Sequence, residues 1–160
     1  MEPDVTLSEV ARLLKPGGIF AAYDCDWPPV CNPAVESAYQ SLDDYVDEVE
    51  ANTPEYREAF VQYPKSEHLE NIRKSGCFGY TREIVFSNTE YCDADRYYRI
   101  ALSQGGTQAI LKKNPSLVEK EMDRFRMVVD YYFEDKVLPI EFCYRLRLGV
   151  KNQQNEDFSA

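Results

Sequence analysis

Two carboxylates and an indole ring follow directly after a short apolar run near the start of the chain. Residues 19–23 form this run, and Asp24, Cys25, Asp26 and Trp27 come next. In open α/β sheets, ligands bind beyond the carboxyl ends of the strands, so these side chains are predicted to lie at the mouth of a site. A carboxylate there would remove a proton from an acceptor or hold an amine. The alternative is that Asp24 and Asp26 accept hydrogen bonds from turn amides and that Trp27 packs beneath neighbouring helices.

A second group of candidate binding residues is Tyr97, Tyr98 and Arg99. The two rings and the guanidinium would add an aromatic wall with one positive charge to the same pocket, although a packing role is the simpler interpretation. His68 falls at the start of a predicted helix and is expected on the surface. Because no nucleophile, base and orienting group can be assigned together, the sequence predicts substrate-binding residues and leaves the catalytic residue unknown.

The five cysteines are too scattered to define a metal or disulfide site. They stand at positions 25, 31, 77, 92 and 143, and none belongs to a CxxC pair. An odd number leaves one thiol over in any disulfide scheme. We therefore expect reduced thiols that act as small core residues, and no zinc site.

Composition and charge exclude several kinds of partner. The 160 residues carry a formal net charge of -10, which argues against nucleic acid because phosphate contacts need clustered cations. The basic stretches at residues 96–99 and 145–147 would neutralise one small anion at most. No apolar run approaches the roughly 18 residues that span a bilayer, and no basic segment followed by an apolar one marks a signal peptide. We expect no membrane partner and a cytoplasmic location.

The elements that position these residues follow from capping residues and hydrophobic periodicity. Helices are predicted over residues 4–14, from Pro33 to about Val49, after Pro54, from Ser66 to Gly76, from Asp93 or Asp95 to a close at Gly105–Gly106, and from beyond Pro115 to Tyr132; strands are predicted over residues 19–23, 80–89 and 140–150. The last strand alternates strictly, and its other face carries Glu141, Arg145 and Arg147, expected to be wet or paired with acids. The pattern indicates an α/β fold in one domain.

The segment from Glu9 to Phe20 contains a compact motif. Its sequence, E-V-A-R-L-L-K-P-G-G-I-F, joins an E-x-x-R-x-L helix to a K-P-G-G turn and then to an apolar strand. This arrangement resembles the segment that leads into the fifth strand of class I S-adenosylmethionine-dependent methyltransferases. The later helices and strands also follow the order of that family's C-terminal half.

The resemblance implies a truncated Rossmann-like methyltransferase fold with about three strands, in which the final strand is antiparallel and lies in the middle. It covers residues 1–152, with a helical insertion at about 32–64, and leaves residues 153–160 as a disordered tail. The strand at 19–23 would lie at an edge of the sheet without its neighbour, and an apolar edge invites pairing with another chain. We therefore expect a homodimer or larger assembly through this edge strand.

The resemblance also implies a function. In that family, the loop after this strand faces a small-molecule acceptor near the transferred methyl group. S-adenosylmethionine is held there by a Gly-rich turn after the first strand and by an acidic residue that ends the second. Gly17–Gly18 precedes a strand and Gly105–Gly106 follows a helical stretch, so neither is such a turn. The cofactor would therefore belong to the parent protein, and this chain alone is expected to bind none and to be inactive.

Two other interpretations stay open. The chain is a non-catalytic binding or oligomerisation module that kept this part of the fold, or it is the C-terminal half of another Rossmann-like transferase. An in-frame G-x-G-rich βα unit upstream of Met1 would favour the methyltransferase, whereas a clean start site would favour the module. The acceptor and the methylated atom are not defined by the sequence.

Overall fold

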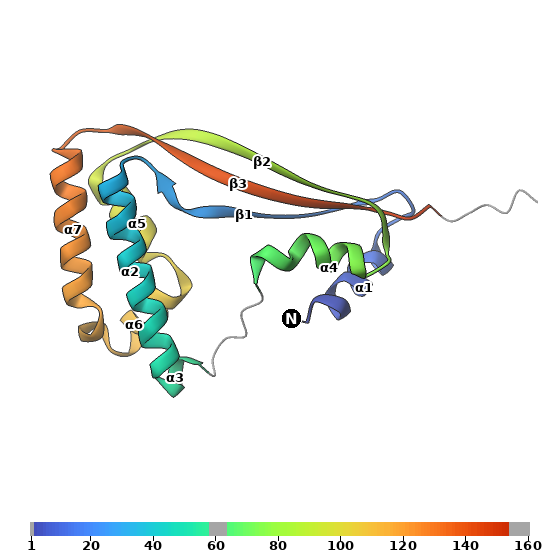
Figure 1. Ribbon diagram of the computed structural model, residues 1–160, viewed down its shortest axis with the longest axis horizontal. Coiled ribbons are helices and arrows are strands. Elements are labelled where there is room, and N and C mark those ends of the chain that lie inside the picture. Colours follow the sequence, from blue (N-terminus) through green and yellow to red (C-terminus); the bar gives the residue numbers. More distant parts are fainter. Residues whose placement is uncertain (1, 58–63, 154–160) are drawn as a thin grey trace, which may run out of the picture. The chain divides into compact units, whose positions relative to one another are not determined.

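The computed structural model describes residues 2–57 and 64–153 (Figure 1). Its helices and strands are α1 (Pro3–Leu13), β1 (Ile19–Val30), α2 (Pro33–Asn52), α3 (Pro54–Arg57), α4 (His68–Lys74), β2 (Phe78–Cys92), α5 (Ala94–Leu102), α6 (Gly105–Lys113), α7 (Glu119–Phe133) and β3 (Leu138–Lys151). Two 3₁₀ turns, η1 (Lys65–Glu67) and η2 (Pro115–Leu117), precede α4 and α7. Nearly all of the predicted tail, and the last residues of the predicted insertion, lie outside the described residues.

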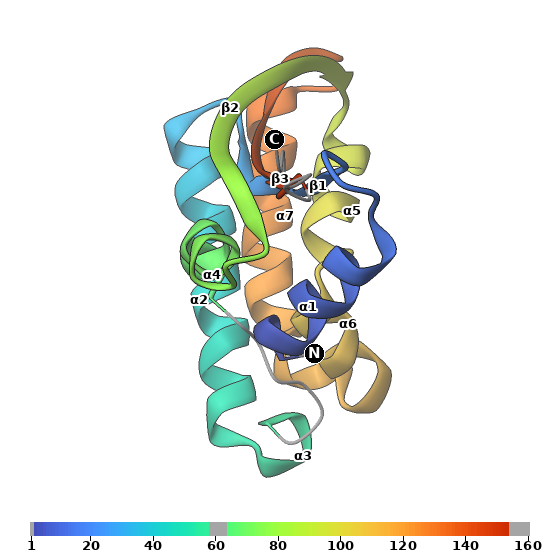
Figure 2. The ribbon, with the colours of Figure 1, turned by 90° about the vertical axis from the view of Figure 1, so that its right-hand side faces the viewer.

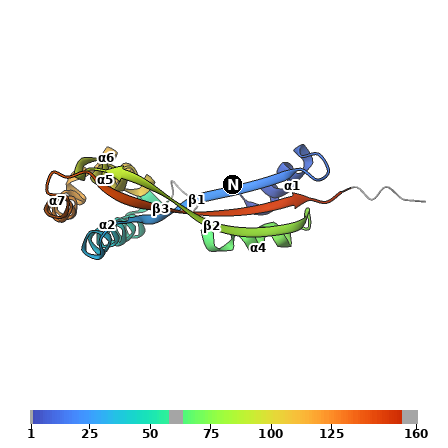
Figure 3. The ribbon, with the colours of Figure 1, turned by 90° about the horizontal axis from the view of Figure 1, so that it is seen from above.

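The three strands form one sheet in the order β1-β3-β2, with the last strand in the middle (Figure 3). Backbone bonds fix the register near one end of β3, where the Lys151 N–H donates to the Gly18 carbonyl at 2.8 Å and the Asn152 N–H donates to the Cys77 carbonyl at 3.2 Å. Both neighbours therefore meet the end of β3 with their own first residues, so β3 is antiparallel to β1 and β2. The predicted α/β class, strand number and central last strand are confirmed.

Local signals placed most helix ends correctly. The Asn32 side chain accepts a hydrogen bond from the Ala34 N–H at the start of α2, and the Asp93 side chain accepts one from the Arg96 N–H at 2.7 Å at the start of α5. These bonds satisfy amide groups that a helix start leaves unpaired. Gly76 follows α4 with φ of 67°, a left-handed conformation that glycine adopts without strain.

The chain divides into two compact units. Unit 1 comprises Met1–Cys25, Val61–Phe86 and Tyr144–Ala160, and unit 2 comprises Asp26–Phe60 and Ser87–Cys143. In unit 1, α1 and α4 lie on the same side of the unit's part of the sheet (Figure 1). Its core is formed by the buried side chains Leu7, Ala11, Ile72 and Phe78, against which Phe20 of β1 packs. The period-2 alternation of β1 thus turns Phe20 toward the helices.

Unit 2 is built around α2, α5, α6 and α7, which lie side by side (Figure 2). Its centre is a cluster of aromatic rings. Tyr39 of α2 meets Phe125 of α7 edge to face at 5.7 Å, and Tyr97 of α5 meets Phe133 at the same centroid distance. All four rings are almost completely buried, so the high aromatic content of the chain is used in packing.

The prediction that β1 ends at Tyr23 and opens into a polar loop is wrong. β1 runs for 12 residues to Val30 and includes Asp24, Asp26 and Trp27. Two features of the fold explain the extension. β3 supplies a partner long enough to continue the pairing, and its Arg147 neutralises Asp24. The prolines at 28 and 29 are tolerated because β1 is an edge strand.

The prediction that α5 closes at Gly105–Gly106 is also wrong. α5 ends at Leu102, Gln104 is extended, and Gly105 begins α6. A Cβ on Gly106 would lie 3.0 Å from Val46 Cγ1 and 2.8 Å from Glu50 Oε1. Gly106 therefore permits close contact between α6 and α2, a tertiary role that local sequence does not reveal.

The turn between α1 and β1 uses its two glycines differently. Gly17 has φ of 74°, the left-handed region, and its N–H donates to the Lys151 carbonyl at 3.1 Å. Gly18 is constrained by space instead. A Cβ on it would lie 2.8 Å from the Lys15 carbonyl oxygen and 3.2 Å from Leu14 Cβ. Each position therefore needs glycine for its own reason.

Replacing Gly18 with alanine should destabilise the chain by about 1–3 kcal/mol, because the added methyl group overlaps backbone that cannot move freely. The matched control is Gly105→Ala, where the new Cβ meets nothing within 4 Å at the start of α6. This change should be neutral or stabilising by about 0.5–1 kcal/mol. Urea unfolding followed by circular dichroism measures both. Equal free energies of unfolding for the two variants would contradict the proposed role of Gly18.

Candidate functional site

The first predicted binding residue, Asp24, lies in an ion-pair network inside unit 1. Its Oδ1 accepts a hydrogen bond from Arg147 Nη1 at 2.5 Å, and its Oδ2 lies 3.2 Å from Lys65 Nζ in an ion pair without hydrogen-bond alignment. The Asp24 side chain keeps 19% of its exposure. Both carboxylate oxygens therefore face cations of the chain itself, and a substrate amine would have to displace Lys65.

Arg147 is the centre of this network. Its side chain is only 5% exposed, and its Nε donates to Glu83 Oε2 at 3.0 Å while Nη1 donates to Asp24. Arg145 shares Glu83, with Nη1 at 3.2 Å from Oε1, but is 37% exposed. The expectation that the polar face of β3 is paired with acids is thus confirmed. The positive charge at residues 145–147 is already compensated by carboxylates of β1 and β2.

Asp26 and Trp27 lie in the part of β1 that belongs to unit 2. Asp26 is half-buried, and the Trp27 residue is 36% exposed. A strand position, rather than a loop, holds both side chains in fixed alternating directions. Their predicted role as acceptor contacts is compatible with partial exposure.

Tyr97 lies inside the aromatic centre of unit 2 and is completely buried. Its hydroxyl donates to the Pro29 carbonyl at 2.9 Å and so ties α5 to the end of β1. Burial, followed by the nearby Cys31 thiol, raises the pKa of Tyr97, so the phenol stays protonated. These contacts favour the packing alternative for Tyr97.

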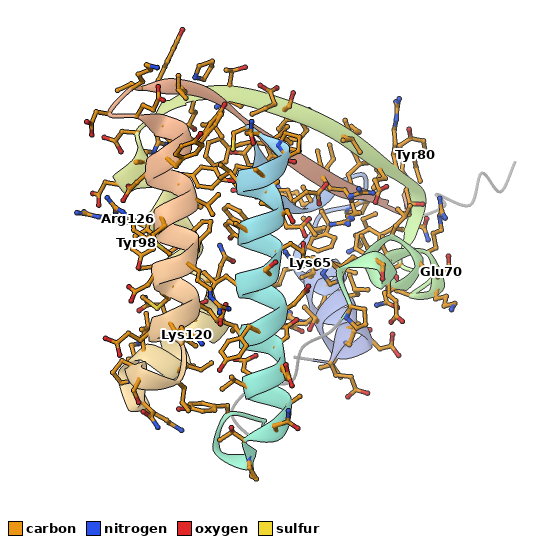
Figure 4. All side chains as sticks on the ribbon, turned by 60° about the vertical axis from the view of Figure 1, so that its left-hand side comes forward. Lys65, Glu70, Tyr80, Tyr98, Lys120 and Arg126 are labelled. Atoms are coloured by element: carbon orange, nitrogen blue, oxygen red, sulfur yellow. The ribbon has the colours of Figure 1, made fainter. Side chains whose placement is uncertain are left out.

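Tyr98 and Arg99 point elsewhere. The Tyr98 ring stacks on Phe125 at 5.9 Å, and the Arg126 guanidinium lies 5.0 Å from its centroid (Figure 4). Arg99 is exposed and its Nη2 lies 2.8 Å from Asp95 Oδ2. The three neighbouring residues therefore have different surroundings: Tyr97 the core, Tyr98 the contact of α5 with α7, and Arg99 the solvent. The structure does not bring them to one pocket.

Two cysteines of unit 2, Cys31 and Cys92, have surroundings that the sequence did not reveal. The Cys31 side chain is hydrogen-bonded with Tyr97, and the Cys31 carbonyl accepts from the Tyr132 hydroxyl at 3.4 Å. Cys92 is 1% exposed, and burial raises its pKa to about 11. None of the five cysteines forms a disulfide in the described part of the chain. No spacing signal could have revealed the contacts of Cys31, because it lies between β1 and α2 whereas Tyr97 belongs to α5 and Tyr132 to α7.

The described residues form neither a metal-binding cluster nor a membrane-spanning helix. Within residues 2–57 and 64–153, no three His, Cys, Asp or Glu side chains come together in a way that would hold a metal ion. Over the same residues, no helix combines the length and the apolar character needed to cross a bilayer. Gly105–Gly106 begins α6 directly after α5 rather than after a strand.

Comparison with known proteins yields only weak likeness. No protein-family model and no curated protein matches the chain. Among solved structures, it is similar to phosphoethanolamine N-methyltransferase 2 of Haemonchus contortus in complex with phosphomonomethylethanolamine and S-adenosylhomocysteine, with 16% sequence identity and a TM-score of 0.30. The match covers 94% of this chain and 30% of that one, so the chain spans less than a third of that enzyme. At this level the likeness assigns neither a family nor a function.

Replacing Arg147 should cost more stability than replacing any other cation of the ion-pair network. Arg147→Met leaves Asp24 and Glu83 largely buried without their shared partner, which should cost about 3 kcal/mol of stability. Arg145→Met is the matched control, since the side chain is more exposed and should change stability by less than about 1 kcal/mol. Urea unfolding of both variants tests this. A loss for Arg147→Met no larger than for Arg145→Met would refute the central role of Arg147.

Cys92 should be the slowest of the five thiols to react. With its pKa raised to about 11, the reactive thiolate at pH 8 makes up on the order of one part in a thousand, and the sulfur is also shielded. Timed alkylation with iodoacetamide, read by peptide mass spectrometry, measures each rate. In urea all five should react alike. Native labelling of Cys92 as fast as that of Cys25 would show that unit 2 opens readily.

Proposed function

We propose that this chain is the C-terminal, acceptor-side portion of an S-adenosylmethionine-dependent methyltransferase that acts on a small molecule. The observation that carries the proposal is the segment from Glu9 to Phe20, in which a helix, a two-glycine turn and an edge strand follow one another in the order that the motif implies. The strand order β1-β3-β2 adds support, because the resemblance also implied an antiparallel last strand in the middle. The first feature is local and the second depends on distant pairing, so they support the proposal independently.

The chain's own contribution would be to bind and orient the acceptor. S-adenosylmethionine, bound by the preceding half of the parent protein, would supply the methyl group. Trp27 offers a partly exposed ring against which an acceptor can pack, and the half-buried Asp26 offers a carboxylate that accepts a hydrogen bond or a proton from the nucleophilic atom. Both lie on one strand, which restricts their motion and favours orientation over general affinity.

A non-catalytic binding or oligomerisation module remains the second candidate, and one observation favours it. Several predicted acceptor contacts are occupied by the chain's own groups: Asp24 by Arg147, Tyr97 by the Pro29 carbonyl, and Arg99 by Asp95. A fold that has lost catalysis has no need to leave such side chains available. The two candidates differ in what they require upstream of this segment and in whether Asp26 and Trp27 matter for turnover.

The test begins with the transcript that contains this segment. Sequencing its 5′ end should reveal, in frame, a strand followed by a G-x-G-rich turn and a helix, the arrangement that binds the cofactor's adenosine and methionine portions. The longer protein should then transfer a labelled methyl group from S-adenosylmethionine to a small-molecule acceptor in an extract of metabolites. A translated product that starts at Met1, with no such unit before it, would contradict the transferase proposal and favour the binding or oligomerisation module.

Substitutions within the longer protein should separate binding from turnover. Trp27→Ala should raise KM about tenfold by removing a packing surface, with little change in kcat. Asp26→Asn should lower kcat about a hundredfold if the carboxylate takes the acceptor's proton. Asp4→Asn, an equal change at an exposed position of α1, is the control. Unchanged kinetics in both test variants would remove these residues from the acceptor site.

A further inference from the structure

One face of unit 1 is apolar and not covered by its helices. Phe20 of β1 turns toward α1 and α4, so Ile19 and Tyr23, at odd-numbered positions of the same strand, turn away. They are 64% and 72% exposed. On β3, Arg147 is buried in its ion pairs, and the flanking Leu146 and Leu148 lie on the opposite side.

The edge strand β2 continues this surface. Thr81 accepts a hydrogen bond from Arg73 of α4, and Glu83 reaches Arg147, so these two side chains lie on the inner side. Beyond Phe78, which is buried at the start of the strand, Tyr80 and Phe86 therefore alternate outward, with 52% and 47% exposure. Phe86 stacks on Tyr144 of β3 at 5.3 Å with an interplanar angle of 19°. We name the surface formed by Ile19, Tyr23, Tyr80, Phe86, Leu146 and Leu148 the open face.

The open face is nearly free of charge in a chain that is strongly acidic. Among the described residues that strand alternation assigns to this side of unit 1, only Arg82 is charged, whereas 29% of the whole chain is Asp, Glu, Lys or Arg. A basic partner would find no carboxylate here, and an acidic partner would find only Arg82. An anionic membrane would be repelled by the chain's net charge of -10. A second apolar sheet face needs no charged group opposite it. Because the second chain carries the same net charge, added salt should strengthen this contact.

The area is also suitable for a second copy. From the exposed fractions, the open face presents roughly 600 Å² of largely apolar surface, at the upper end of the range for the largest patch on a typical monomer. Two such faces packed together would bury roughly 1,200 Å², the lower limit of stable protein interfaces. Sheets pack face to face with interdigitating side chains, and aromatic rings such as Tyr23 and Phe86 are the residues that carry most interface energy.

We propose that unit 1 forms a homodimer through its open face, with the sheet of one copy packed on the sheet of the other. The occupant of each face is the same face of the second chain, related by a twofold axis. This goes beyond the transferase proposal and does not rest on it, because it depends only on the exposure and charge of these side chains. It also differs from pairing through the edge of β1, which would use backbone groups rather than this surface.

Sedimentation of the full 160-residue chain tests the proposal. At micromolar concentrations the wild type should sediment as a dimer of its 18.5 kDa chain. Tyr23→Lys should weaken the dimer about tenfold or more, because it places an ammonium group in an apolar contact, while the exposed position lets each monomer fold. The matched control, Tyr131→Lys, makes the same charge change at an 84% exposed tyrosine of α7 and should leave the dimer intact.

Three outcomes overturn the proposal: a monomeric wild type, a Tyr23→Lys dimer as tight as the wild type, or a Tyr131→Lys dimer weakened equally. Amide hydrogen exchange distinguishes the face from the edge. Face packing leaves exchange of the outer amides of β1 unchanged between monomer and dimer, whereas edge pairing would protect them. Circular dichroism of each variant verifies folding. Loss of methyl transfer in a longer protein would leave this result untouched, so the two proposals fail separately.

Discussion

The structure depends on one strand that must satisfy two neighbours at once. β3 is the last of the three strands and lies between β1 and β2, so it pairs with one neighbour on each side. It serves both units: Ile140 and Phe142 are buried in unit 2, whereas Arg147 is buried in unit 1. The buried side of β3 therefore changes along the strand, from even-numbered residues in unit 2 to an odd-numbered residue in unit 1. Neither β1 nor β2 would have a sheet partner without it.

A buried arginine in the middle strand then dictates its surroundings. Arg147 cannot lose its charge, so its burial requires carboxylates on each side, and Asp24 of β1 and Glu83 of β2 supply them. Such a pairing adds little net stability over an apolar contact, but it rejects registers in which the carboxylates are displaced. On this argument, Asp24 is a register-determining residue of the sheet, and its position near the motif reflects folding as much as chemistry.

What the residues themselves predicted correctly was local, whereas the central position of the last strand was predicted by the resemblance. Asn32, Asp93 and Gly76 mark helix ends through bonds or conformations that involve only nearby residues, and the turn at Gly17–Gly18 joins the expected helix to the expected strand. The extension of β1 depended on a strand partner more than a hundred residues away in the sequence. Rules about polar or proline residues consider only nearby positions, so they cannot identify that partner. Three of the candidate binding residues lie in different surroundings for a related reason. Tyr97, Tyr98 and Arg99 are adjacent in sequence, but helical geometry turns adjacent residues to different sides.

The layer structure of unit 1 gives the two proposals a common physical origin. A sheet with helices on one side and large apolar side chains on the other leaves that second side to be covered by something outside the unit. The open face would be covered either by the preceding half of a transferase or by a second copy of this chain. The two would compete wherever they contact the same part of the open face. Dimerisation of the isolated segment is therefore no evidence against a longer enzyme, because the covering layer in that enzyme would replace the partner chain. The decisive quantity is the accessibility of Tyr23 in each form: buried by the second copy in one case, and by the chain's own preceding residues in the other.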